Sequence, residues 1–590
     1  MSKVIGLDFE TETDKDNNCK PLLCCLNGEN YKEAFELDVR ERYEAFYWTL
    51  VLSGHTYVVF NASFDIEIIM IMLMKNGFKF LMNEQAPAHK TMKLTMGQKI
   101  YELRTYFRLK GKLIETRYVD LANILVGNTL EEVAEMFTDL HKGNFEASKN
   151  NREKFIEYCM LDAEITRVAY MNVCNILGKQ YLTIGSAAFN IMLNMSFKGK
   201  TKREKFGKFR AIFGNNDLEF DDKIRKWYAG GFGWASTDDR TEVNINSYDL
   251  KSAYPSVSVD KLPTSKDKMT ISGYAEPNEK YPYAFIHMKV TGQVRENYAP
   301  VLPSRNIYGD SNIYLYDDKD VYIIQEYGKK SEYEWFLENV EIDDIEYIET
   351  ILMKDASYNP LRNYMLYYYA KKEHDVGIMR EMDKRLLNAL TGKLGTNPRK
   401  ENIQFRLDEN NKIVKNSAEE VLTEVYATHI VAVITSRVRC KCYEVDSMIR
   451  DKVSFRMYAT DSVKHSSNIS VIKTGKTLGE WDLEYKDIEF IFLGLKAYIF
   501  DANNKQGKRK VMCAGISKKY KPLIKNEDFF ASTVVKSLIS VRSGNGRIIY
   551  EGEKRIATPV KKPRTRRALY EQIRKQKNTK TRYKRNTEAE

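Results

Sequence analysis

The chain has 590 residues, a formal net charge of +12, and a composition that is 43% hydrophobic and 29% charged. This length is too great for one hydrophobic core, so we expect several domains of a soluble globular protein. No uncharged apolar run approaches the length of a membrane span, and the eight cysteines form neither a CxxC pair nor a zinc-ligand pattern. The cysteines are therefore expected to be free thiols in a reducing compartment. No signal peptide is expected, because residues 1–3 run straight into a predicted strand.

The positive charge is concentrated at one end of the chain. Residues 554–585 hold fourteen Lys or Arg and a single acid, so they carry +13, while the other 558 residues sum to −1. Such a segment either binds a polyanion or is a solvated tail. Tyr570 and Tyr583 are interleaved with its basic residues, which favours contact with a nucleic-acid backbone.

Acids follow two apolar strands that are predicted early in the chain. The strand at residues 3–9 ends in Asp8 and Glu10, which point the same way because residues two apart in a strand share a face. A second strand, at residues 56–60, is followed by Asp65 at a helix start. Like charges side by side are costly unless a cation lies between them. Taken alone, the first pair is also compatible with a solvated strand end.

A helix is predicted over residues 152–171 and carries Tyr158 and Asp162 one turn apart on one face. Alone, this pair would be an ordinary helix face. With the three earlier acids it suits an exonuclease in which two metal ions activate water, which Tyr158 would orient.

A second set of acids lies further along the chain. Asp249 ends a short alternating strand and precedes a Ser-x-Tyr-Pro turn, and Asp461 lies in a tight turn between two strands at residues 455–463. Two such carboxylates suffice for metal-dependent phosphoryl transfer. Residues 364–390 are largely helical and basic, which suits a triphosphate but also fits a solvated face.

The first set of acids resembles the proofreading exonuclease motifs of family B DNA polymerases. The motifs D-x-E, N-x-x-[F/Y]-D and Y-x-x-x-D occur in order, as Asp8 and Glu10, then Asn61, Phe64 and Asp65, then Tyr158 and Asp162. The resemblance implies that the four acids bind metal, and it implies single-strand contacts by Thr11, Asn61, Phe64 and Leu121. Lys142 resembles the assisting lysine of the protein-primed subgroup. Asp120 departs from that subgroup, which has Ser before the Leu.

The rest of the chain resembles the polymerase motifs of the same family. Tyr228, Gly230 and Gly231 match the Y-x-G-G loop, and Asp249 to Ser256 match motif A, in which Asp249 and the Leu250 carbonyl bind metal and Tyr254 selects dNTPs. The resemblance further implies nucleotide contacts by Lys372, Arg380, Lys384 and Asn388 around motif B, and DNA contacts by Thr435, Arg439, Lys496 and Tyr498. Asp461 matches a metal-binding acid of motif C.

Two departures stand out among these motifs. In an ungapped alignment Ala459 replaces the first acid of motif C, and Thr391 replaces a Tyr of motif B that lines the nascent base pair. A gapped alignment would keep Tyr458 as the Tyr of motif C, but it would need a strand bulge. One family acid is absent in either alignment.

The resemblance implies a multidomain α/β (α+β) fold, with a ribonuclease H-like exonuclease domain followed by a right-hand polymerase. The predicted parts of the first half are the exonuclease domain (1–185), the start of the palm with the Y-x-G-G loop and motif A (186–260), and an insertion that resembles the first terminal-protein region (261–360). The predicted parts of the second half are the fingers with motif B (361–397), a β-hairpin insertion that resembles the second terminal-protein region (398–420), the rest of the palm with motif C and K-x-Y (421–524), and the thumb with the basic segment (525–590).

The function implied is that of a protein-primed family B DNA polymerase of the small linear-genome podophage type, processive and strand-displacing, with 3′–5′ proofreading. It would use two Mg²⁺ per active site, replaceable by Mn²⁺. Its partners would be template-primer DNA, dNTPs and a terminal protein, in the cytoplasm of a bacterial host, as a monomer or a heterodimer with the terminal protein. The alternatives are a 3′–5′ exonuclease with an impaired polymerase domain and a non-catalytic DNA-binding protein.

Overall fold

The structure is a computed structural model that describes residues 3–556 apart from short gaps. These gaps are residues 14–18, 63, 82–84, 97–98, 149–150, 215–216, 232, 303, 306–311, 314, 410–412, 467–471, 530–533 and 544–545. The basic segment predicted at residues 554–585 falls almost wholly outside the described residues. The chain forms two compact units, one of residues 1–191, 370–426 and 539–550, and one of residues 192–369, 427–538 and 551–590.

An eight-stranded mixed sheet is the framework of the first unit, in the order β3-β2-β1-β4-β8-β7-β6-β5. Its strands are β1 (Val4–Thr13), β2 (Cys19–Gly28), β3 (Tyr31–Glu36), β4 (Thr56–Val59), β5 (Lys79–Phe80), β6 (Thr91–Met96), β7 (Ile100–Leu109) and β8 (Lys112–Asp120). β1, β4 and β8 are adjacent and parallel, so their carboxyl ends meet at one edge. Residues that follow these ends are therefore brought together, although the sequence separates them widely.

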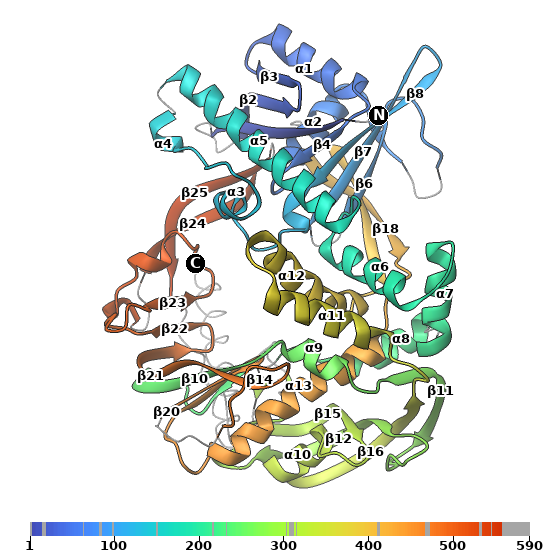
Figure 1. Cartoon of the computed structure of the whole chain (residues 1–590), viewed down its shortest axis with the longest axis vertical. Helices are drawn as coiled ribbons and strands as arrows, with labels where there is room; N and C mark the ends of the chain where they lie inside the picture. The colour runs from blue at the N-terminus through green and yellow to red at the C-terminus, as the bar shows by residue number, and fades with distance from the viewer. Residues whose placement is uncertain are drawn as a thin grey trace, which may run out of the picture. The chain divides into compact units, whose positions relative to one another are not determined.

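Helices cover both faces of this sheet. They are α1 (Arg40–Leu52), α2 (Asp65–Lys75), α3 (Leu130–Phe137), α4 (Phe145–Ser148) and α5 (Arg152–Leu177), with a short η1 (Leu121–Asn123) after β8. α5 lies across β1 and β2 (Figure 1). A Cβ atom at Gly6 would lie 1.9 Å from the carbonyl oxygen of Ala163, so only glycine lets β1 and α5 approach this closely.

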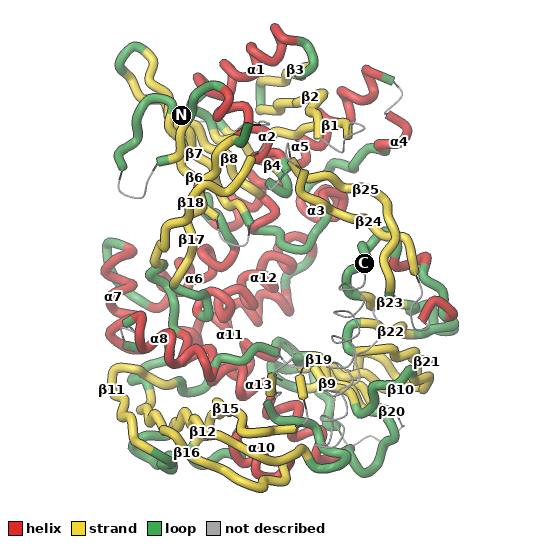
Figure 2. Tube along the Cα trace, turned by 180° about the vertical axis from the view of Figure 1, so that it is seen from behind, coloured by secondary structure: helices red, strands yellow, loops and turns green. Residues whose placement is uncertain are grey.

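Two further pieces belong at least in part to the first unit. α11 (Pro360–His374) and α12 (Gly377–Leu394) form the basic helical segment, and β17 (Arg399–Leu407) pairs with β18 (Ile413–Leu422) as the predicted hairpin (Figure 2). Phe405 and Ile413 join the apolar core of the eight-stranded sheet, and the ring centroids of Phe80 and Phe405 are 6.2 Å apart. The end of the hairpin next to its turn is therefore packed against this sheet.

A seven-stranded sheet is the framework of the second unit, in the order β23-β22-β21-β10-β20-β19-β9. Its strands are β9 (Gly233–Ala235), β10 (Thr241–Leu250), β19 (Arg456–Ala459), β20 (Ser462–Ser466), β21 (Trp481–Gly494), β22 (Ala497–Phe500) and β23 (Lys510–Cys513). β10 lies between β20 and β21 and is antiparallel to both. The strand that carries Asp249 is therefore central and is fixed on both sides.

The residues predicted as the first insertion contain a four-stranded sheet in the order β11-β16-β12-β15. It consists of β11 (Pro263–Ser272), β12 (Tyr283–Val294), β15 (Leu315–Glu326) and β16 (Val340–Asp355), with α10 (Glu332–Asn339) against it. Trp227 of η2 (Arg225–Trp227) and Val433 of α13 (Thr428–Ile449) share its apolar core.

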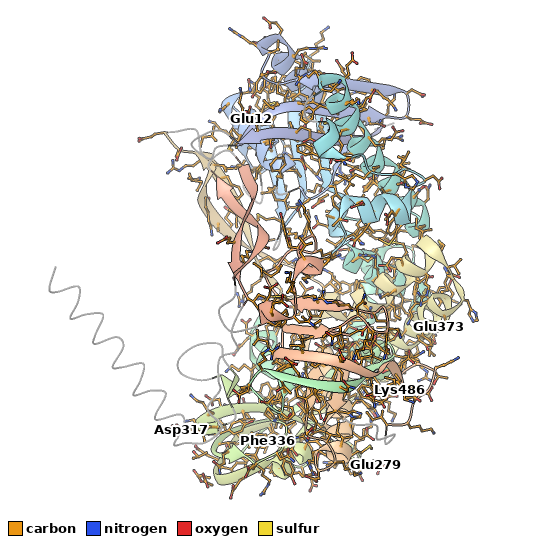
Figure 3. All side chains as sticks on the ribbon, turned by 90° about the vertical axis from the view of Figure 1, so that its left-hand side faces the viewer. Glu12, Glu279, Asp317, Phe336, Glu373 and Lys486 are labelled. Carbon is orange, nitrogen blue, oxygen red and sulfur yellow. The ribbon has the colours of Figure 1, made fainter. Side chains whose placement is uncertain are left out.

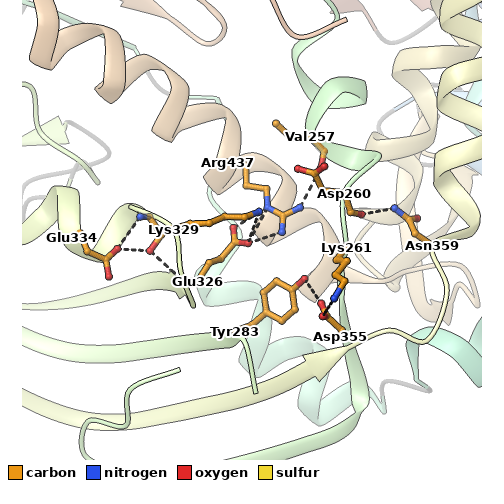
Figure 4. Close-up of polar contacts among 11 residues, drawn as sticks. Val257, Asp260, Lys261, Tyr283, Glu326, Lys329, Glu334, Asp355, Asn359 and Arg437 are labelled. Atoms are coloured by element: carbon orange, nitrogen blue, oxygen red, sulfur yellow. Dashed lines mark hydrogen bonds and ion pairs between the residues drawn. The ribbon is translucent and has the colours of Figure 1, made fainter. Parts of the chain in front are cut away.

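A buried ion pair joins this sheet to α13 and α9 (Ala253–Ser258). The guanidinium of Arg437 donates to both carboxylate oxygens of Glu326, with Nε at 2.8 and 3.1 Å, and to the carbonyl oxygen of Val257 (Figure 4). Arg437 is 8% exposed and Glu326 is 6% exposed, so losing either partner would strand a charge in the interior. This pair fixes the helix that follows Asp249.

The remaining described elements are short or peripheral. They are α6 (Ile184–Ser196), α7 (Lys202–Phe213), α8 (Leu218–Ile224), β13 (Ser304–Arg305), β14 (Asn312–Ile313), η3 (Lys521–Leu523), η4 (Glu527–Phe529), β24 (Val534–Ser543) and β25 (Gly546–Arg555). Among the described residues, no helix has the length and apolarity needed to cross a bilayer.

Candidate active sites

Four acids from three elements meet at the shared edge of the first sheet. Asp8 and Glu10 lie on β1, Asp65 begins α2 just past β4, and Asp162 projects from α5. Burial is the largest cause that raises the pKa of Asp8, and the charges of Asp162, Asp65 and Glu10 raise it further. The carboxylates predicted to act together are therefore close enough to repel one another.

The same repulsion extends through the cluster. Burial and the charge of Asp162 raise the pKa of Glu10 to about 7. Burial also raises the pKa of Asp65, and the charge of Asp120 raises it further. Asp162 keeps a buried Oδ1 that has no hydrogen-bond partner among the described residues. Oxygen ligands with excess negative charge suit hard divalent cations, so these residues fit the metal ions that the chemistry requires.

Lys142 offsets part of the negative charge in this cluster. Its Nζ lies 2.5 Å from Oδ2 of Asp162 and 5.1 Å from the ring centroid of Tyr158. Its ion pair with Asp162 outweighs burial and raises the pKa of Lys142. The predicted assisting lysine therefore stands among the predicted acids and the predicted tyrosine.

A thiol also lies at this site. The ligand atoms of Asp8, Glu10 and Cys159 all lie within 4.8 Å of one another, and the Cys159 Sγ donates to the carbonyl oxygen of Asp8 at 3.5 Å. Burial raises the pKa of Cys159 well above its usual value, so the thiol stays protonated and packs behind the acids.

Asp120 is a functional candidate whose role the sequence did not indicate. It ends β8 and is 4% exposed, and its Oδ1 accepts hydrogen bonds from the backbone N–H groups of Asn61 and Ala122, each at 2.9 Å. Burial raises the pKa of Asp120 to about 6, although these hydrogen bonds oppose the shift. Asn61 has φ of 69°, so this carboxylate holds a strained turn in place.

The four predicted single-strand contacts differ in their exposure. Asn61 is exposed, Thr11 and Phe64 are half-buried, and Leu121 is 0% exposed within η1. The burial of Leu121 does not favour a contact by its side chain, and that contact stays a prediction. Asp120 stands where the protein-primed subgroup has Ser, and its carboxylate supports the loop that carries Asn61 and Phe64.

The second site lies where β10 ends beside the β19–β20 turn. The backbone N–H of Leu250 donates to the carbonyl oxygen of Asp461 at 2.9 Å, which brings the segments of Asp249 and Asp461 together. Ser252 and Thr460 flank the two acids and both have positive φ, 49° and 63°. Non-glycine residues in this conformation are uncommon and mark tight, functionally constrained turns.

Residue pairing across the sheet bears on the alignment of motif C. Ala459 pairs with Ser462, and Ser462 pairs with Asp249, so the three share one face of the sheet. The pairing of β19 with β20 has no bulge, which favours the ungapped alignment. Asp482 on β21 pairs with Asp249 on its other side. Asp249 therefore has Asp482 as its paired neighbour on one side and Ser462 on the other, and the methyl group of Ala459 lies one strand beyond Ser462.

The charges of this site resemble those of the first. Burial raises the pKa of Asp249 to about 7, and the charges of Asp461 and Glu484 contribute to the shift. Burial also raises the pKa of Asp461, and Glu484 adds to it. Tyr254, on α9, is half-buried, and its pKa is raised by burial and by Asp461. These acids fit a divalent cation, with fewer ligands than at the first site.

The Y-x-G-G loop packs against the turn that carries Asp461. A Cβ atom at Gly231 would lie 2.4 Å from Cγ2 of Thr460, whereas no atom lies within 4 Å of a Cβ at Gly230. Arg439 donates from Nη1 to the carbonyl oxygens of Ala229 and Gly230, at 2.5 and 3.0 Å. Gly231 is therefore needed for contact with Thr460.

Arg439, predicted to contact DNA, is buried beneath the Y-x-G-G loop. It is 2% exposed and forms a 2.6 Å ion pair with Glu332, which is 1% exposed. This guanidinium supports the Y-x-G-G loop through its hydrogen bonds; its burial does not favour a contact with a phosphate, and that contact stays a prediction. Thr435 is 4% exposed, and its hydroxyl donates to the carbonyl oxygen of Ala432.

The other predicted DNA contacts of this unit lie on loops and strands. Lys496 is exposed between β21 and β22, Tyr498 is 7% exposed on β22, and Tyr228 is half-buried in the Y-x-G-G loop. Their contacts with DNA stay predictions.

The predicted nucleotide-binding residues lie on α11 and α12. Arg380, Lys384 and Asn388 are spaced four apart on α12 and all are exposed, so they line one helix face. Lys372 is half-buried, and its carbonyl oxygen accepts a hydrogen bond from Nε of Arg380 at 3.2 Å. Thr391, on the same helix, is 6% exposed.

Comparison with known proteins decides the family. The family "DNA polymerase type B, organellar and viral" matches residues 53–471 of the chain. The chain belongs to this family. It is therefore a DNA-directed DNA polymerase, and the predicted enzyme class is confirmed.

Relatives and solved structures agree with the family. The DNA polymerase of Bacillus phage M2 is 26% identical over 89% of this chain and 94% of its own length, and that of Bacillus phage phi29 is 24% identical over the same shares. The phi29 DNA polymerase structure with primer-template DNA and incoming nucleotide superposes with a TM-score of 0.80 at 22% identity, covering 94% of this chain and 100% of that one. This likeness confirms the predicted multidomain α/β fold.

The polymerase should depend on Gly231 more than on Gly230. Gly231→Ala forces the turn of Asp461 to shift, so we expect primer extension to slow about tenfold or more, because small misplacements of reacting groups are costly. Gly230→Ala is the matched control with free space around its Cβ. Adding Thr460→Gly removes the clash and suits the positive φ, so it should restore the rate of Gly231→Ala. Equal rates for the two single variants would contradict this account.

Exonucleolytic hydrolysis should depend on the acceptor oxygen of Asp120. Asp120→Ala leaves the backbone N–H groups of Asn61 and Ala122 without their acceptor, at about 1–3 kcal/mol for the buried Ala122 group, and should raise KM for single-stranded DNA more than it lowers kcat. Asp120→Asn keeps one carbonyl acceptor and should rescue KM. Asp139→Ala removes an exposed acid of the same unit and is the control. An unchanged KM in Asp120→Ala would contradict the positioning role.

Proposed function

We propose that this polymerase extends primers at Asp249 and Asp461 and hydrolyses mispaired 3′ ends at Asp8, Glu10, Asp65 and Asp162. Mg²⁺ is the proposed cofactor, with two ions at each site and with Mn²⁺ able to replace it. The observation that carries the proposal is the hydrogen bond from Leu250 to Asp461, which joins two acids 212 positions apart at the end of a central strand.

The residues around Asp249 and Asp461, which form the proposed site of synthesis (the synthetic site), have distinct proposed roles. Bound divalent ions supply Lewis acidity, which lowers the pKa of the attacking hydroxyl and stabilises the departing pyrophosphate. Asp249, the Leu250 carbonyl and Asp461 hold these ions. Tyr254 lies under the deoxyribose and excludes a 2′-hydroxyl.

The basic helices bind the incoming nucleotide in this proposal. Lys372, Arg380 and Lys384 neutralise the triphosphate, and Asn388 contacts the nucleotide. The exposure of Arg380, Lys384 and Asn388 on one face of α12 supports these roles, since a bound phosphate needs an accessible row of donors.

The residues around Asp8, Glu10, Asp65 and Asp162 form the proposed site of hydrolysis (the hydrolytic site) and act on a frayed 3′ end. Tyr158 orients the attacking water, and Lys142 neutralises charge that develops at the phosphate. Thr11, Asn61 and Phe64 hold the single strand. The mutual repulsion of the acids supports this assignment, because bound cations would relieve the part of it that Lys142 leaves.

The proposal includes protein priming, processivity and strand displacement. The four-stranded sheet within residues 261–360 and the β17–β18 hairpin support it, because they fall where the resemblance implies the first and second terminal-protein regions. A terminal-protein hydroxyl would then replace the primer 3′-OH. The enzyme would act in the cytoplasm of an infected bacterium, as a monomer or bound to its terminal protein.

One other candidate function has an observation in its favour. Ala459 and Thr391 stand where the family has an acid and a tyrosine, so the synthetic site lacks two expected groups. A 3′–5′ exonuclease with an impaired polymerase domain would fit these departures.

Substitutions should separate the two activities. Asp249→Asn should reduce dNTP incorporation on a primer-template by at least about a thousandfold while leaving hydrolysis of single-stranded DNA intact, because it removes a charged ligand from one site only. Asp8→Ala with Asp65→Ala should give the reverse pattern. Hydrolysis without extension by the unsubstituted enzyme, in Mg²⁺ and in Mn²⁺, would favour the impaired-polymerase function.

Priming can be tested with a labelled nucleotide. Incubation of the enzyme with a candidate terminal protein, labelled dNTP and Mg²⁺ should give a protein–nucleotide adduct, and Asp249→Asn should abolish it. Extension of DNA primers without any adduct from the phage's own terminal protein would contradict protein priming while leaving the polymerase assignment intact.

A further inference from the structure

Lys464 is a buried lysine next to the proposed synthetic site. It lies on β20, pairs with Ser247 of β10 and with Met457 of β19, and is 4% exposed. Residues two apart on a strand share a face, so Lys464 stands on the face that Ser462, Asp249 and Ala459 occupy. Lys464 therefore lies on the same face of the sheet as Asp249, two residues along β20 from Ser462, which is the residue paired with Asp249.

The contacts of Lys464 are well defined. Its Nζ donates to the hydroxyl of Ser462 at 2.8 Å and lies 5.7 Å from the ring centroid of Phe500 and 6.0 Å from that of Tyr498. Within the part of the chain that the structure describes, no carboxylate forms an ion pair with it. A buried charge without a direct counter-ion is costly, so the electrostatic field of nearby groups must help to keep the ammonium group protonated.

That field comes from the acids of the site. Burial lowers the pKa of Lys464 to about 8, and the charges of Glu484, Asp249 and Asp461 oppose the decrease. The group is therefore mostly protonated at neutral pH. In turn, Lys464 lowers the pKa values of Asp249 and Asp461. The lysine and the two acids thus interact electrostatically without touching.

Ala459 and Lys464 both make the synthetic site less negative. Ala459 removes an acid from this face, and Lys464 adds a cation to it, so both changes reduce the attraction of the site for a divalent ion. Packing alone would also fill the space between Met457 and Phe500, but an apolar side chain would do so without desolvating a charge.

We propose that Lys464 is a built-in cation of the synthetic site that weakens its affinity for divalent metal ions and so sets the metal concentration at which the site fills. This inference rests on the proposed role of Asp249 and Asp461 as metal ligands. Lys464 positions no substrate in this account and acts through its charge.

The test is a direct titration with Mn²⁺, without DNA or nucleotide, followed by the electron paramagnetic resonance signal of free Mn²⁺. All variants carry Asp8→Ala and Asp65→Ala, which weaken the competing site. Lys464→Met and Lys464→Gln remove the charge at nearly constant volume, and Lys464→Arg keeps it. Lys486→Met removes an exposed positive charge from β21, at the position labelled in Figure 3, and is the matched control.

The expected result is that the Met and Gln variants bind Mn²⁺ about threefold or more tightly than their parent, because one repelling charge is gone. The Arg and Lys486→Met variants should bind like the parent. The inference is overturned if the Met and Gln variants bind no more tightly, or if Lys486→Met tightens binding equally. The melting curve of each variant shows whether it is folded. If Lys464→Met is misfolded, the Mn²⁺ affinity of Lys464→Gln decides the test.

One further variant separates this inference from the function on which it rests. Asp249→Asn in the same background should abolish the Mn²⁺ binding that the lysine variants modulate. If binding persists in that variant, the ligand assignment fails. If binding is lost but Lys464 has no effect, only the inference fails.

Discussion

Both candidate active sites depend on the cost of keeping several carboxylates ionised in a confined space. At the first site, burial and the neighbouring acids raise the pKa of Glu10 to about 7, and at the second they raise that of Asp249 to about 7. Such groups gain most from a divalent cation, because it stabilises the charged form that burial penalises. The two sites offset this cost differently. Lys142 forms an ion pair with Asp162, whereas Lys464 lies near Asp249 and Asp461 without touching them.

The second unit holds its acids in place through buried ion pairs of one helix. Arg437 of α13 pairs with Glu326 and reaches the carbonyl oxygen of Val257, just past motif A, while Arg439 pairs with Glu332 and supports the Y-x-G-G loop. Both glutamates belong to the segment predicted as an insertion. Removal of one partner from a buried pair is strongly destabilising, so this segment also supports the loops around the proposed metal-binding acids Asp249 and Asp461.

Much of this could be read from the sequence where local patterns decide the structure. The strands before Asp8 and Asp65, the helix that carries Asp162 and the turn of Asp461 follow from apolar periodicity and turn residues. The roles of Asp120 and Lys464 could not be read in this way. They depend on which strands are neighbours, since β8 lies beside β4 and β20 beside β10. The buried ion pair of Arg439 with Glu332 could not be read either, because a basic residue on a helix looks the same in sequence whether it faces solvent or an acid in the core.

We propose that one chain both adds and removes nucleotides at two separate metal-dependent sites. The most direct measurement supplies a primer-template with Mg²⁺ and only the next correct dNTP, labelled at its α-phosphate, and follows the release of labelled dNMP over time. Continuous release of labelled dNMP is expected, because each added nucleotide is excised and replaced. Release of the label should stop when either Asp249 or the pair Asp8 and Asp65 is substituted, since the label must be incorporated before it can be excised. No labelled dNMP from the unsubstituted enzyme, or release of the label that persists without Asp249, would contradict the proposal.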